Sequence, residues 1–145
     1  MVIKSHNGEE INIFEIKNKK ILLSFHPLAW TSICAKQMKI LEKRYDSFLK
    51  LNTISFGVSV DTEPSKKEWA KVLKIKKLQL LCDFWPHGEL AKKFDIFLEK
   101  FGFSQRANIL LDENKNIILK KVYPIKKLPN FDEIIDYIKK GGVKL

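Results

Sequence analysis

The chain has 145 residues, of which 45% are hydrophobic and 30% charged, and this balance excludes a disordered or collagen-like protein. Its two cysteines are too few for a disulfide scaffold or a four-cysteine metal site. No apolar run reaches the ~18 residues of a membrane helix, and residues 1–10 lack the apolar core of a signal peptide. We therefore expect a single domain over residues 1–145, with no membrane attachment and a cytoplasmic location.

The formal net charge of +10 raises the question of a nucleic-acid-binding module. The 27 basic residues are scattered along the chain, however, and Arg44 and Arg106 are the only arginines among them. Because arginine is the usual bidentate reader of bases and phosphates, we expect a solvated basic surface and no nucleic-acid partner. Where lysine is used almost everywhere else, an arginine marks a position at which planar, permanent charge could matter.

The first half of the chain predicts a β-hairpin, a strand and a long helix. Asn7-Gly8 is a turn signal, and the return strand of the hairpin is expected at residues 11–14. Residues 21–25 form an apolar run, which is typical of a strand buried on both faces. A helix is expected from residue 32 to about residue 51, because apolar residues recur there at helical spacing: Met38, Leu41, Tyr45 and Phe48.

The second half continues the alternation and ends with an antiparallel pair before a last helix. The expected strands are 53–60, 78–81, 107–111 and 116–122. The expected helices are one that begins near Pro64, one at about 88–94 and one at 131–139. Trp69, Val72 and Leu73 are expected to form the apolar stripe of the helix after Pro64.

This order of elements predicts a mixed α/β sheet with helices on both faces. Functional sites in such sheets gather beyond the carboxyl ends of the parallel strands. The segments that follow such strands here are residues 26–34, 61–64 and 82–88. Candidate functional residues are therefore sought in these three segments.

Cys34 stands at a junction between a predicted strand and a predicted helix. If Thr31 is the N-cap, Cys34 is the third helical residue and lies near free N–H groups at the positive end of the helix dipole, which favours a thiolate. A cysteine with the ordinary pKa of about 8.5 is only about 3% thiolate at pH 7. We interpret Cys34 as a reactive thiol, with Thr31 and Pro27 close to the sulfur. The alternative is a buried, inert cysteine on an apolar helix.

The segment from Pro27 to Cys34 reads P-x-x-x-T-x-x-C after a short hydrophobic strand. It resembles the peroxidatic signature of the peroxiredoxins, the AhpC/TSA-like redoxin family, at all three fixed positions. The resemblance continues through GVSVDT at 57–62, LLCDFWPHGELAKKF at 80–94 and SQRANILLDENKNI at 104–117. The DFWPHG motif looks closest to the one-cysteine, AhpE-like branch. The resemblance implies a thioredoxin-like fold with a mixed central sheet, helices on both faces and an N-terminal β-hairpin.

The resemblance also implies a thiol-dependent peroxidase that reduces hydrogen peroxide or alkyl hydroperoxides. Cys34 matches the cysteine that becomes a sulfenic acid, Thr31 the hydroxyl that holds the peroxide, and Pro27 the ring that shields the site. Arg106 matches the active-site arginine, and Gln37 stands where many relatives have a glutamate. The partners implied are the peroxide and an external thiol or thioredoxin-like reductant, and no cofactor is expected.

Cys82 has two interpretations. It closes a strand at the edge where sites gather, so that a disulfide with Cys34 is conceivable, but a small buried packing residue also fits the apolar strand end. No cysteine lies five residues after Cys34, where some members of the family keep a resolving thiol. A metal is not expected, because no close ligand pair exists among the candidate ligands, which are Cys34, Cys82, His26 and His87.

Two other functions stay open at this point. A thioredoxin-like disulfide oxidoreductase without peroxidase activity would use the same fold, although the chain has no C-x-x-C motif. A basic nucleic-acid-binding module is the other alternative, and the scattered lysines speak against it. Trp30 and Trp85, as exposed aromatic residues, could form the face of a homodimer.

Overall fold

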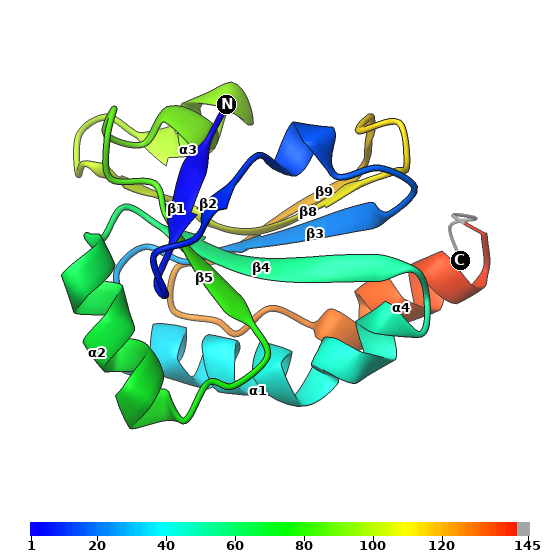
Figure 1. The fold of residues 1–145 in the computed structure, drawn as a ribbon, viewed down its shortest axis with the longest axis horizontal. Helices are drawn as coiled ribbons and strands as arrows, with labels where there is room; N and C mark the ends of the chain where they lie inside the picture. The colour runs from blue at the N-terminus through cyan, green and yellow to red at the C-terminus, as the bar shows by residue number, and fades with distance from the viewer. Residues whose placement is uncertain (142–145) are drawn as a thin grey trace.

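The computed structural model describes residues 1–141, and residues 142–145 of the predicted domain lie outside the described residues. Its centre is a seven-stranded sheet with the order β2-β1-β5-β4-β3-β8-β9 (Figure 1). β3, β4 and β5 are parallel to one another, while β1 pairs with β5, and β8 with β3, in the antiparallel direction. The strands of this sheet are β1 (Ile3–Ser5), β2 (Glu10–Ile11), β3 (Lys20–Phe25), β4 (Thr53–Ser59), β5 (Gln79–Cys82), β8 (Arg106–Leu111) and β9 (Ile117–Tyr123).

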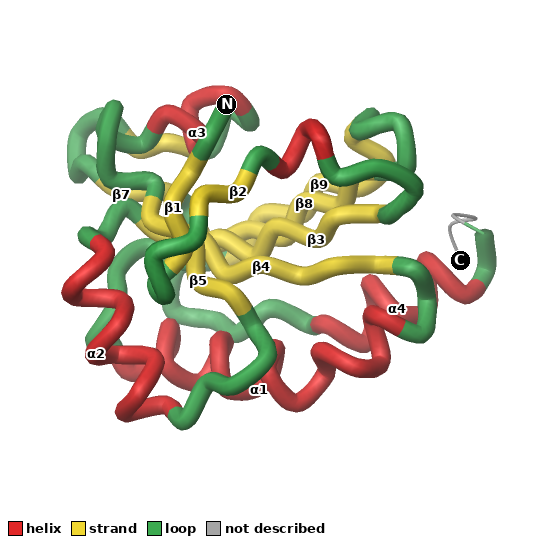
Figure 2. The backbone as a smooth tube through the Cα atoms, viewed as in Figure 1, coloured by secondary structure: helices red, strands yellow, loops and turns green. Residues whose placement is uncertain are grey.

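Helices cover both faces of the sheet, and the predicted mixed α/β architecture is confirmed (Figure 2). One face carries α1 (Ser32–Leu49), α2 (Glu63–Leu73) and α4 (Phe131–Lys139). The other face carries α3 (Glu89–Lys93) and the short 3-10 helix η1 (Ile13–Glu15). None of the helices within residues 1–141 is long and apolar enough to span a lipid bilayer.

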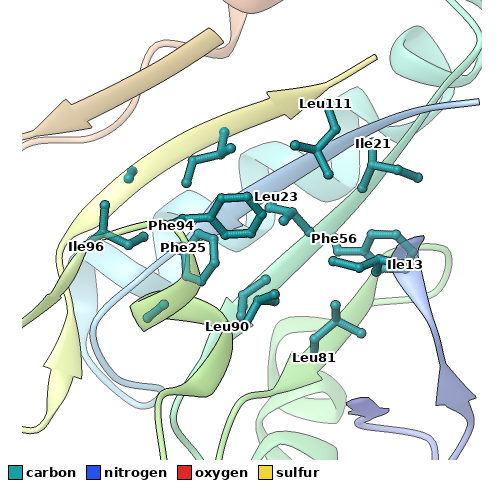
Figure 3. Close-up of a cluster of buried hydrophobic side chains, with 14 of the residues drawn as sticks. Ile13, Ile21, Leu23, Phe25, Phe56, Leu81, Leu90, Phe94, Ile96 and Leu111 are labelled. Carbon is teal, nitrogen blue, oxygen red and sulfur yellow. The ribbon is translucent and has the colours of Figure 1, made fainter. Parts of the chain in front are cut away.

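Alternate residues of β3 face two different hydrophobic cores, as expected for a strand buried on both sides. Leu22 packs toward α1, where it meets Met38. Leu23 and Phe25 point to the opposite core, in which the Phe25 ring lies edge-on to the ring of Phe94 at 6.2 Å (Figure 3). Burial of each such side chain contributes about 1.5–3 kcal/mol to the stability of the fold. β3 is therefore held in place, and with it the first residue of the loop that follows.

Gly57 of β4 lets α1 lie directly on the sheet. A Cβ atom at this position would overlap the sulfur of Met38 and come within 2.9 Å of Leu80 Cδ2. Side chains this closely packed leave α1 little freedom to shift. The turn of α1 that contains Met38 is thus fixed against the sheet. It positions the preceding turn of the helix, which carries Cys34.

The N-terminal β-hairpin is confirmed, with Ile3 opposite Ile11 across the turn. The predicted return strand at 11–14 is wrong, because the strand is Glu10–Ile11 and a 3-10 helix follows. The cause is local: the Asn12 side chain accepts a hydrogen bond from the N–H of Phe14, and asparagine in this position favours a turn over a continued strand.

The predicted apolar stripe of α2 is only partly right. Trp69 and Leu73 are buried, but Val72 is 63% exposed, because it lies outside the buried face that the four-residue spacing of the other two defines. The sequence prediction also did not include the two-stranded sheet of β6 (Phe97–Leu98) and β7 (Phe103–Ser104). These strands are only two residues long, too short for a periodic pattern.

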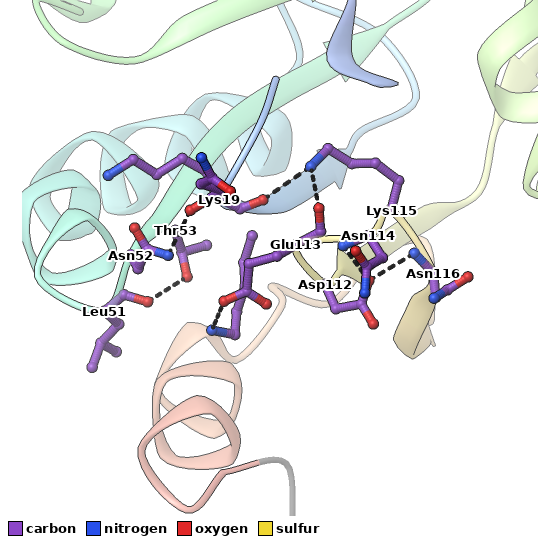
Figure 4. A network of polar contacts seen from close by, with 11 residues as sticks. Lys19, Leu51, Asn52, Thr53, Asp112, Glu113, Asn114, Lys115 and Asn116 are labelled. Atoms are coloured by element: carbon purple, nitrogen blue, oxygen red, sulfur yellow. Dashed lines mark hydrogen bonds and ion pairs between the residues drawn. The ribbon is translucent and has the colours of Figure 1, made fainter. Parts of the chain in front are cut away.

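A polar network closes the end of the sheet at which β3 and β4 begin (Figure 4). Lys20 Nζ lies 3.0 Å from Glu113 Oε2, and Lys115 Nζ donates to the carbonyl oxygens of Lys19 and Glu113. The Asp112 carboxylate accepts two backbone N–H groups of the turn between β8 and β9. These contacts fix the predicted β8–β9 hairpin at the end of the sheet opposite the carboxyl ends of β3 and β4.

Candidate active site

Cys34 lies in the first turn of α1, directly beyond the carboxyl end of β3. Thr31 is the N-cap residue with an extended backbone, so that Cys34 is the third helical residue, as predicted. The cysteine is 1% exposed. The sulfur is thus placed close to the free N–H groups of an 18-residue helix, where the helix dipole favours a negative charge.

The loop between β3 and α1 is tied to the neighbouring elements by hydrogen bonds. The N–H of Ala29 donates to Asp61 Oδ2 at 2.7 Å, and the Ser59 hydroxyl donates to the same oxygen at 2.6 Å. Trp30 Nε1 donates to Ser65 Oγ on α2 at 3.0 Å, and Trp30 has a φ of +68°, which few non-glycine residues adopt. These contacts hold the loop in one conformation before any substrate binds.

Arg106 of β8 reaches the sulfur of Cys34. The arginine is 3% exposed, and its Nη1 lies 3.4 Å from Cys34 Sγ and 2.6 Å from Gln37 Oε1. Its Nε and Nη2 donate to the carbonyl oxygen of Ile125 at 3.0 and 2.8 Å. A buried guanidinium in this position stabilises a thiolate by charge and by hydrogen bonding.

Gln37 connects Arg106 to the strand that leads to the site. While its oxygen accepts from Arg106, its Nε2 donates to Ser24 Oγ at 2.8 Å and to the carbonyl oxygen of Phe25 at 3.2 Å. The side chain is fully buried. The amide oxygen of Gln37 faces a donor and the amide nitrogen faces two acceptors. The amide group therefore has only one favourable orientation.

The four predicted site residues line one pocket of 250 Å³. Pro27 is buried beside the sulfur, while Thr31 is exposed and donates its hydroxyl proton to the carbonyl oxygen of Leu28 at 2.9 Å. The threonine oxygen therefore keeps its lone pairs for another donor. The lining residues are Pro27, Leu28, Thr31, Ser32, Ile33, Cys34, Phe103, Arg106 and Ile125.

Cys82 lies apart from this pocket. It ends β5 between Lys4 of β1 and Ser59 of β4, and it lines a separate cavity of 290 Å³. Both cysteines are free thiols. Burial raises the pKa of the Cys82 thiol to about 11, although the nearby ammonium of Lys66 acts in the opposite direction.

The two histidines that were considered as candidate metal ligands have other contacts. The exposed His87 has its Nε2 2.6 Å from the carbonyl oxygen of Gly102, and the ring of the buried His26 lies against Trp69. Within residues 1–141 no group of three histidine, cysteine, aspartate or glutamate side chains is placed to hold a metal ion.

Sequence reasoning did not find two buried features: the group that holds Arg106 and a lysine that contacts His26, the residue before Pro27. The Ile125 carbonyl that holds Arg106 is a backbone group in a loop, and such a group leaves no signature in the sequence. Lys66 of α2 is fully buried with its Nζ 3.2 Å from His26 Nε2. Its spacing to Trp69 and Leu73 places it on the buried face of α2, and that signal was available in the sequence.

A comparison with protein families identifies the family of this chain. The model of the AhpC/TSA family matches residues 1–120. This chain belongs to the AhpC/TSA family. The membership predicted from the motif around Cys34 is therefore confirmed, and the matched region contains every predicted site residue.

Individual family members are similar over much of the chain. "Peroxiredoxin 2" of Picrophilus torridus is 30% identical over 134 residues, which cover 89% of this chain and 66% of the relative. "Alkyl hydroperoxide reductase E" of Mycobacterium tuberculosis is 32% identical over 96 residues, 66% of this chain and 62% of the relative. The chain thus spans slightly less than two thirds of the length of these curated relatives.

Solved structures of the family have the same fold. The crystal structure of Enterococcus faecalis AhpC superposes with a TM-score of 0.86 at 20% identity, over 99% of this chain and 91% of that one. The predicted thioredoxin-like fold is confirmed by this likeness.

Proposed function

We propose that this protein is a thiol-dependent peroxidase that reduces hydrogen peroxide or alkyl hydroperoxides at Cys34. The observation that carries the proposal is the 3.4 Å contact between Arg106 Nη1 and Cys34 Sγ at a pocket, in a chain that belongs to the AhpC/TSA family. The names of the relatives, peroxiredoxin and alkyl hydroperoxide reductase, agree with this activity.

In the proposed first step the Cys34 thiolate attacks the terminal oxygen of the peroxide. A sulfur–oxygen bond forms as the oxygen–oxygen bond breaks, and the leaving oxygen takes the bonding electron pair and one proton to become water or an alcohol. The sulfur is oxidised to sulfenic acid, and the peroxide is reduced. In this proposal Arg106, whose Nη1 contacts the sulfur, stabilises both the thiolate and the negative charge that develops on the peroxide oxygens.

Thr31 and Pro27 have supporting roles in this proposal. Because the Thr31 proton is donated to the Leu28 carbonyl, its oxygen can accept the O–H of the peroxide and hold it in line with the sulfur. Pro27 lines the pocket without a free N–H group and excludes water from one side of the sulfur.

The walls of the pocket favour an alkyl hydroperoxide over hydrogen peroxide as substrate. Apolar side chains surround the polar centre, and they can contact the organic part of such a substrate. The side chains that provide this surface are Leu28, Ile33, Phe103 and Ile125. The substrate class is part of the proposal and is tested by comparing kcat/KM for the two kinds of peroxide.

An external thiol or a thioredoxin-like protein completes the proposed cycle. One thiol condenses with the sulfenic acid and releases water, and a second thiol displaces the first and restores Cys34. We assign Cys82 no resolving role, because its raised pKa of about 11 leaves little thiolate to attack the sulfenic acid.

Two further parts of the proposal concern the setting of the protein. A cytoplasmic location would supply the thiols that the cycle consumes. A homodimer would cover the exposed aromatic side chains Trp30 and Trp85, which are 53% and 83% exposed. Analytical ultracentrifugation of the reduced protein tests the second point, with a monomer at micromolar concentration as the contrary result.

The decisive experiment is intact-mass analysis after one equivalent of peroxide, followed by peptide mapping. The expected product carries one added oxygen on the peptide that contains Cys34. Cys34→Ser is expected to keep the fold but to consume no peroxide, because no other residue supplies the nucleophile. Substantial turnover by this variant would refute the peroxidase proposal, and a protein that exchanges disulfides but gains no oxygen would indicate the oxidoreductase alternative.

A further inference from the structure

The loop of residues 124–130 joins β9 to α4 (Figure 1) and carries a group that holds Arg106. The Ile125 carbonyl oxygen accepts hydrogen bonds from Nε and Nη2 of this arginine, and the Ile125 side chain lines the pocket at Cys34. Loops are usually more mobile than the elements that they connect. The orientation of Arg106 therefore depends on what fixes this loop.

The loop has little of its own to fix its position. The N–H of Lys127 donates to the carbonyl oxygen of Pro124 at 3.0 Å, so that Ile125 is the second residue of a four-residue turn. The Ile125 side chain is 42% exposed, and its packing holds the residue only in part. The turn sets the shape of the loop, but it does not attach the loop to the sheet.

The two ends of the loop are joined by the side chain of Tyr123, the last residue of β9. Its hydroxyl donates to Glu133 Oε1, in the first turn of α4, at 2.5 Å. The other oxygen of this carboxylate lies 2.8 Å from Lys121 Nζ, and the backbone N–H of Glu133 donates to the side chain of Asn130, the N-cap residue, at 3.3 Å. A hydrogen bond to an ionised carboxylate is roughly twice as strong as one between neutral groups.

Tyr123 also lies directly beside Arg106. The two residues are opposite one another in the β8–β9 ladder. The Tyr123 hydroxyl accepts from Nδ2 of Asn108, two residues along β8, at 3.4 Å. Because alternate residues of a strand face the same side, Arg106 and Asn108 share one face of the sheet. The hydroxyl thus connects β8, β9 and α4 at the end of the sheet where the candidate site lies.

The contact between Tyr123 and Glu133 persists over the pH range in which a thiol titrates. Burial, and then the hydrogen bond to Glu133, raises the pKa of Tyr123, so the phenol keeps its proton. Burial opposes the ionisation of Glu133, but the hydrogen bonds from Lys121 and Tyr123 outweigh it and lower the pKa of this carboxyl. Tyr123 is therefore a donor and Glu133 a charged acceptor from about pH 5 to about pH 10.

We propose that Tyr123 is a positioning residue for the site at Cys34. Its hydroxyl joins the end of β9 to the start of α4, and the loop closed in this way holds the Ile125 carbonyl where it orients Arg106. Nη1 of Arg106 in turn lies 3.4 Å from Sγ of Cys34. The inference rests on the proposed function in one respect, that the thiolate of Cys34 is the reacting group.

The test compares Tyr123→Phe with Tyr137→Phe, since phenylalanine keeps the ring and removes only the hydroxyl. Tyr137 is the matched control, because its hydroxyl also joins α4 to β9. It donates to the carbonyl oxygen of Ile118 at 2.8 Å, at the end of β9 opposite the loop. Each variant loses a hydrogen bond between the same two elements, so an effect of reduced stability alone should be similar in both.

The first readout is the Nε–H group of Arg106, which donates to the Ile125 carbonyl. Its exchange with water is followed by ¹⁵N NMR, and the chain has only one other arginine, Arg44 on the surface. We expect this exchange to be about fivefold faster in Tyr123→Phe than in the wild type, as for the loss of one hydrogen bond. In Tyr137→Phe it should stay within about twofold of the wild type.

The second readout is the rate at which iodoacetamide alkylates Cys34, followed by peptide mass spectrometry from pH 5 to pH 10. Thiolate, rather than thiol, is the species that reacts. Because a less well oriented Arg106 stabilises the thiolate less, the midpoint of the profile for Tyr123→Phe should rise by about half a unit, which slows alkylation about threefold below the midpoint. A change in access to the sulfur would instead alter the rate at every pH. Tyr137→Phe should keep the wild-type midpoint.

Variants of Glu133 test the same contact from α4 and do not depend on how well Tyr123→Phe folds. Glu133→Gln keeps an oxygen that can accept from Tyr123, whereas Glu133→Leu offers no acceptor. Both variants lose the ion pair with Lys121. We expect Glu133→Leu to reproduce both effects of Tyr123→Phe, and Glu133→Gln to stay closer to the wild type.

Three results would each overturn the proposal. One is a Tyr123→Phe protein that matches Tyr137→Phe in both readouts, and another is faster exchange of Arg106 Nε–H with no shift in the Cys34 midpoint. The third is an equal effect of Glu133→Gln and Glu133→Leu. Neither readout uses peroxide, so a wild-type protein that consumes no peroxide would refute the proposed function alone, and these measurements would still decide the role of Tyr123.

Discussion

Nη1 of Arg106 lies 3.4 Å from Sγ of Cys34, although 72 residues separate them in the sequence. The same nitrogen contacts Gln37, and the other guanidinium nitrogens are fixed by the carbonyl of Ile125. The guanidinium is therefore oriented before a substrate arrives, and in the proposed reaction no reorganisation of the protein is needed when negative charge develops on the reacting oxygens. Hydrogen-bond donors that are fixed in this way stabilise a developing negative charge far more strongly in a buried site than in water.

Arg106→Lys is expected to slow the reaction with peroxide at least tenfold, which is about 1.4 kcal/mol of barrier. Lysine keeps the charge but has a single nitrogen, which cannot contact Cys34, Gln37 and Ile125 at once. The second-order rate of peroxide consumption measures the effect. Arg44→Lys is the matched control, since Arg44 forms a surface ion pair with Asp132 at 3.0 Å. A rate for Arg106→Lys within about twofold of the wild type would contradict the active-site assignment.

The sequence predicted the parts of the site that depend on local structure. The position of Cys34 follows from a buried strand, a proline and an N-cap, and all of these are readable within about ten residues. Arg44 of α1 pairs with Asp132 of α4, and this contact depends on how the two helices pack, which the residue types do not reveal. The support of Arg106 by the Ile125 carbonyl likewise depends on the tertiary fold and could not be read from the residue types.

Gln37→Met is expected to slow peroxide reduction and to destabilise the protein. Methionine fills a similar volume but offers no strong hydrogen-bonding group, so that Arg106 loses one contact, and Ser24 and the Phe25 carbonyl lose their donor. Each buried polar group left unpaired costs about 1–3 kcal/mol. Urea unfolding and the rate of peroxide consumption measure the two effects.

Gln37→Glu provides the comparison for this variant. Glutamate keeps an oxygen that accepts from Arg106, but it adds a negative charge that pairs with the guanidinium, and it loses the donor to Ser24 and Phe25. A rate closer to the wild type in Gln37→Glu than in Gln37→Met is expected if orientation of Arg106 is the role of this residue. Equal rates in all three proteins would show that Gln37 contributes to folding alone.

Cys82→Ser is expected to leave the oxidation of Cys34 and turnover with a small thiol nearly unchanged. Cys82 is hydrogen-bonded within the sheet through both neighbouring strands, and its pKa of about 11 keeps it protonated. Without an internal resolving thiol, excess peroxide converts the sulfenic acid to sulfinic acid. The wild type and the variant should therefore lose activity at similar peroxide concentrations.

Two observations together would contradict this prediction for Cys82. An intramolecular disulfide in the wild type, detected by non-reducing peptide mapping, together with earlier over-oxidation of Cys82→Ser, would make Cys82 the resolving thiol. Because β4 lies between β3 and β5, the end of β5 would then have to leave the sheet during each cycle. Hydrogen exchange at residues 79–82 would rise on oxidation in that case.

The last prediction concerns stability and follows from the burial of Lys66. In the unfolded chain this lysine holds its proton up to about pH 10.5, while in the folded protein burial lowers its pKa to about 8. Between these two values the unfolded state binds more protons, so this lysine makes the wild type more stable as the pH rises from about 8 to 10.5. Below pH 8 the buried charge is present and its full cost is felt.

Lys66→Met removes this titration. The variant also loses the hydrogen bonds to His26 and Leu81, and this loss is the same at every pH. The effect of the titration is therefore measured by how the difference in unfolding free energy between variant and wild type changes with pH. Relative to that of Lys66→Met, the unfolding free energy of the wild type should increase by about 3 kcal/mol from pH 7 to pH 10.5. His26 does not contribute in this window, because its pKa lies well below 6.5.

Urea unfolding of the two proteins at pH 7, 8.5 and 10.5 provides the measurement, with Lys67→Met as the control. Groups that do not interact with Lys66 titrate alike in all three proteins, and their effects cancel in the differences between them. Lys67 is exposed, so its replacement should give a difference that is nearly independent of pH. If the Lys66→Met difference is equally flat, Lys66 is not held as a buried cation whose pKa burial lowers.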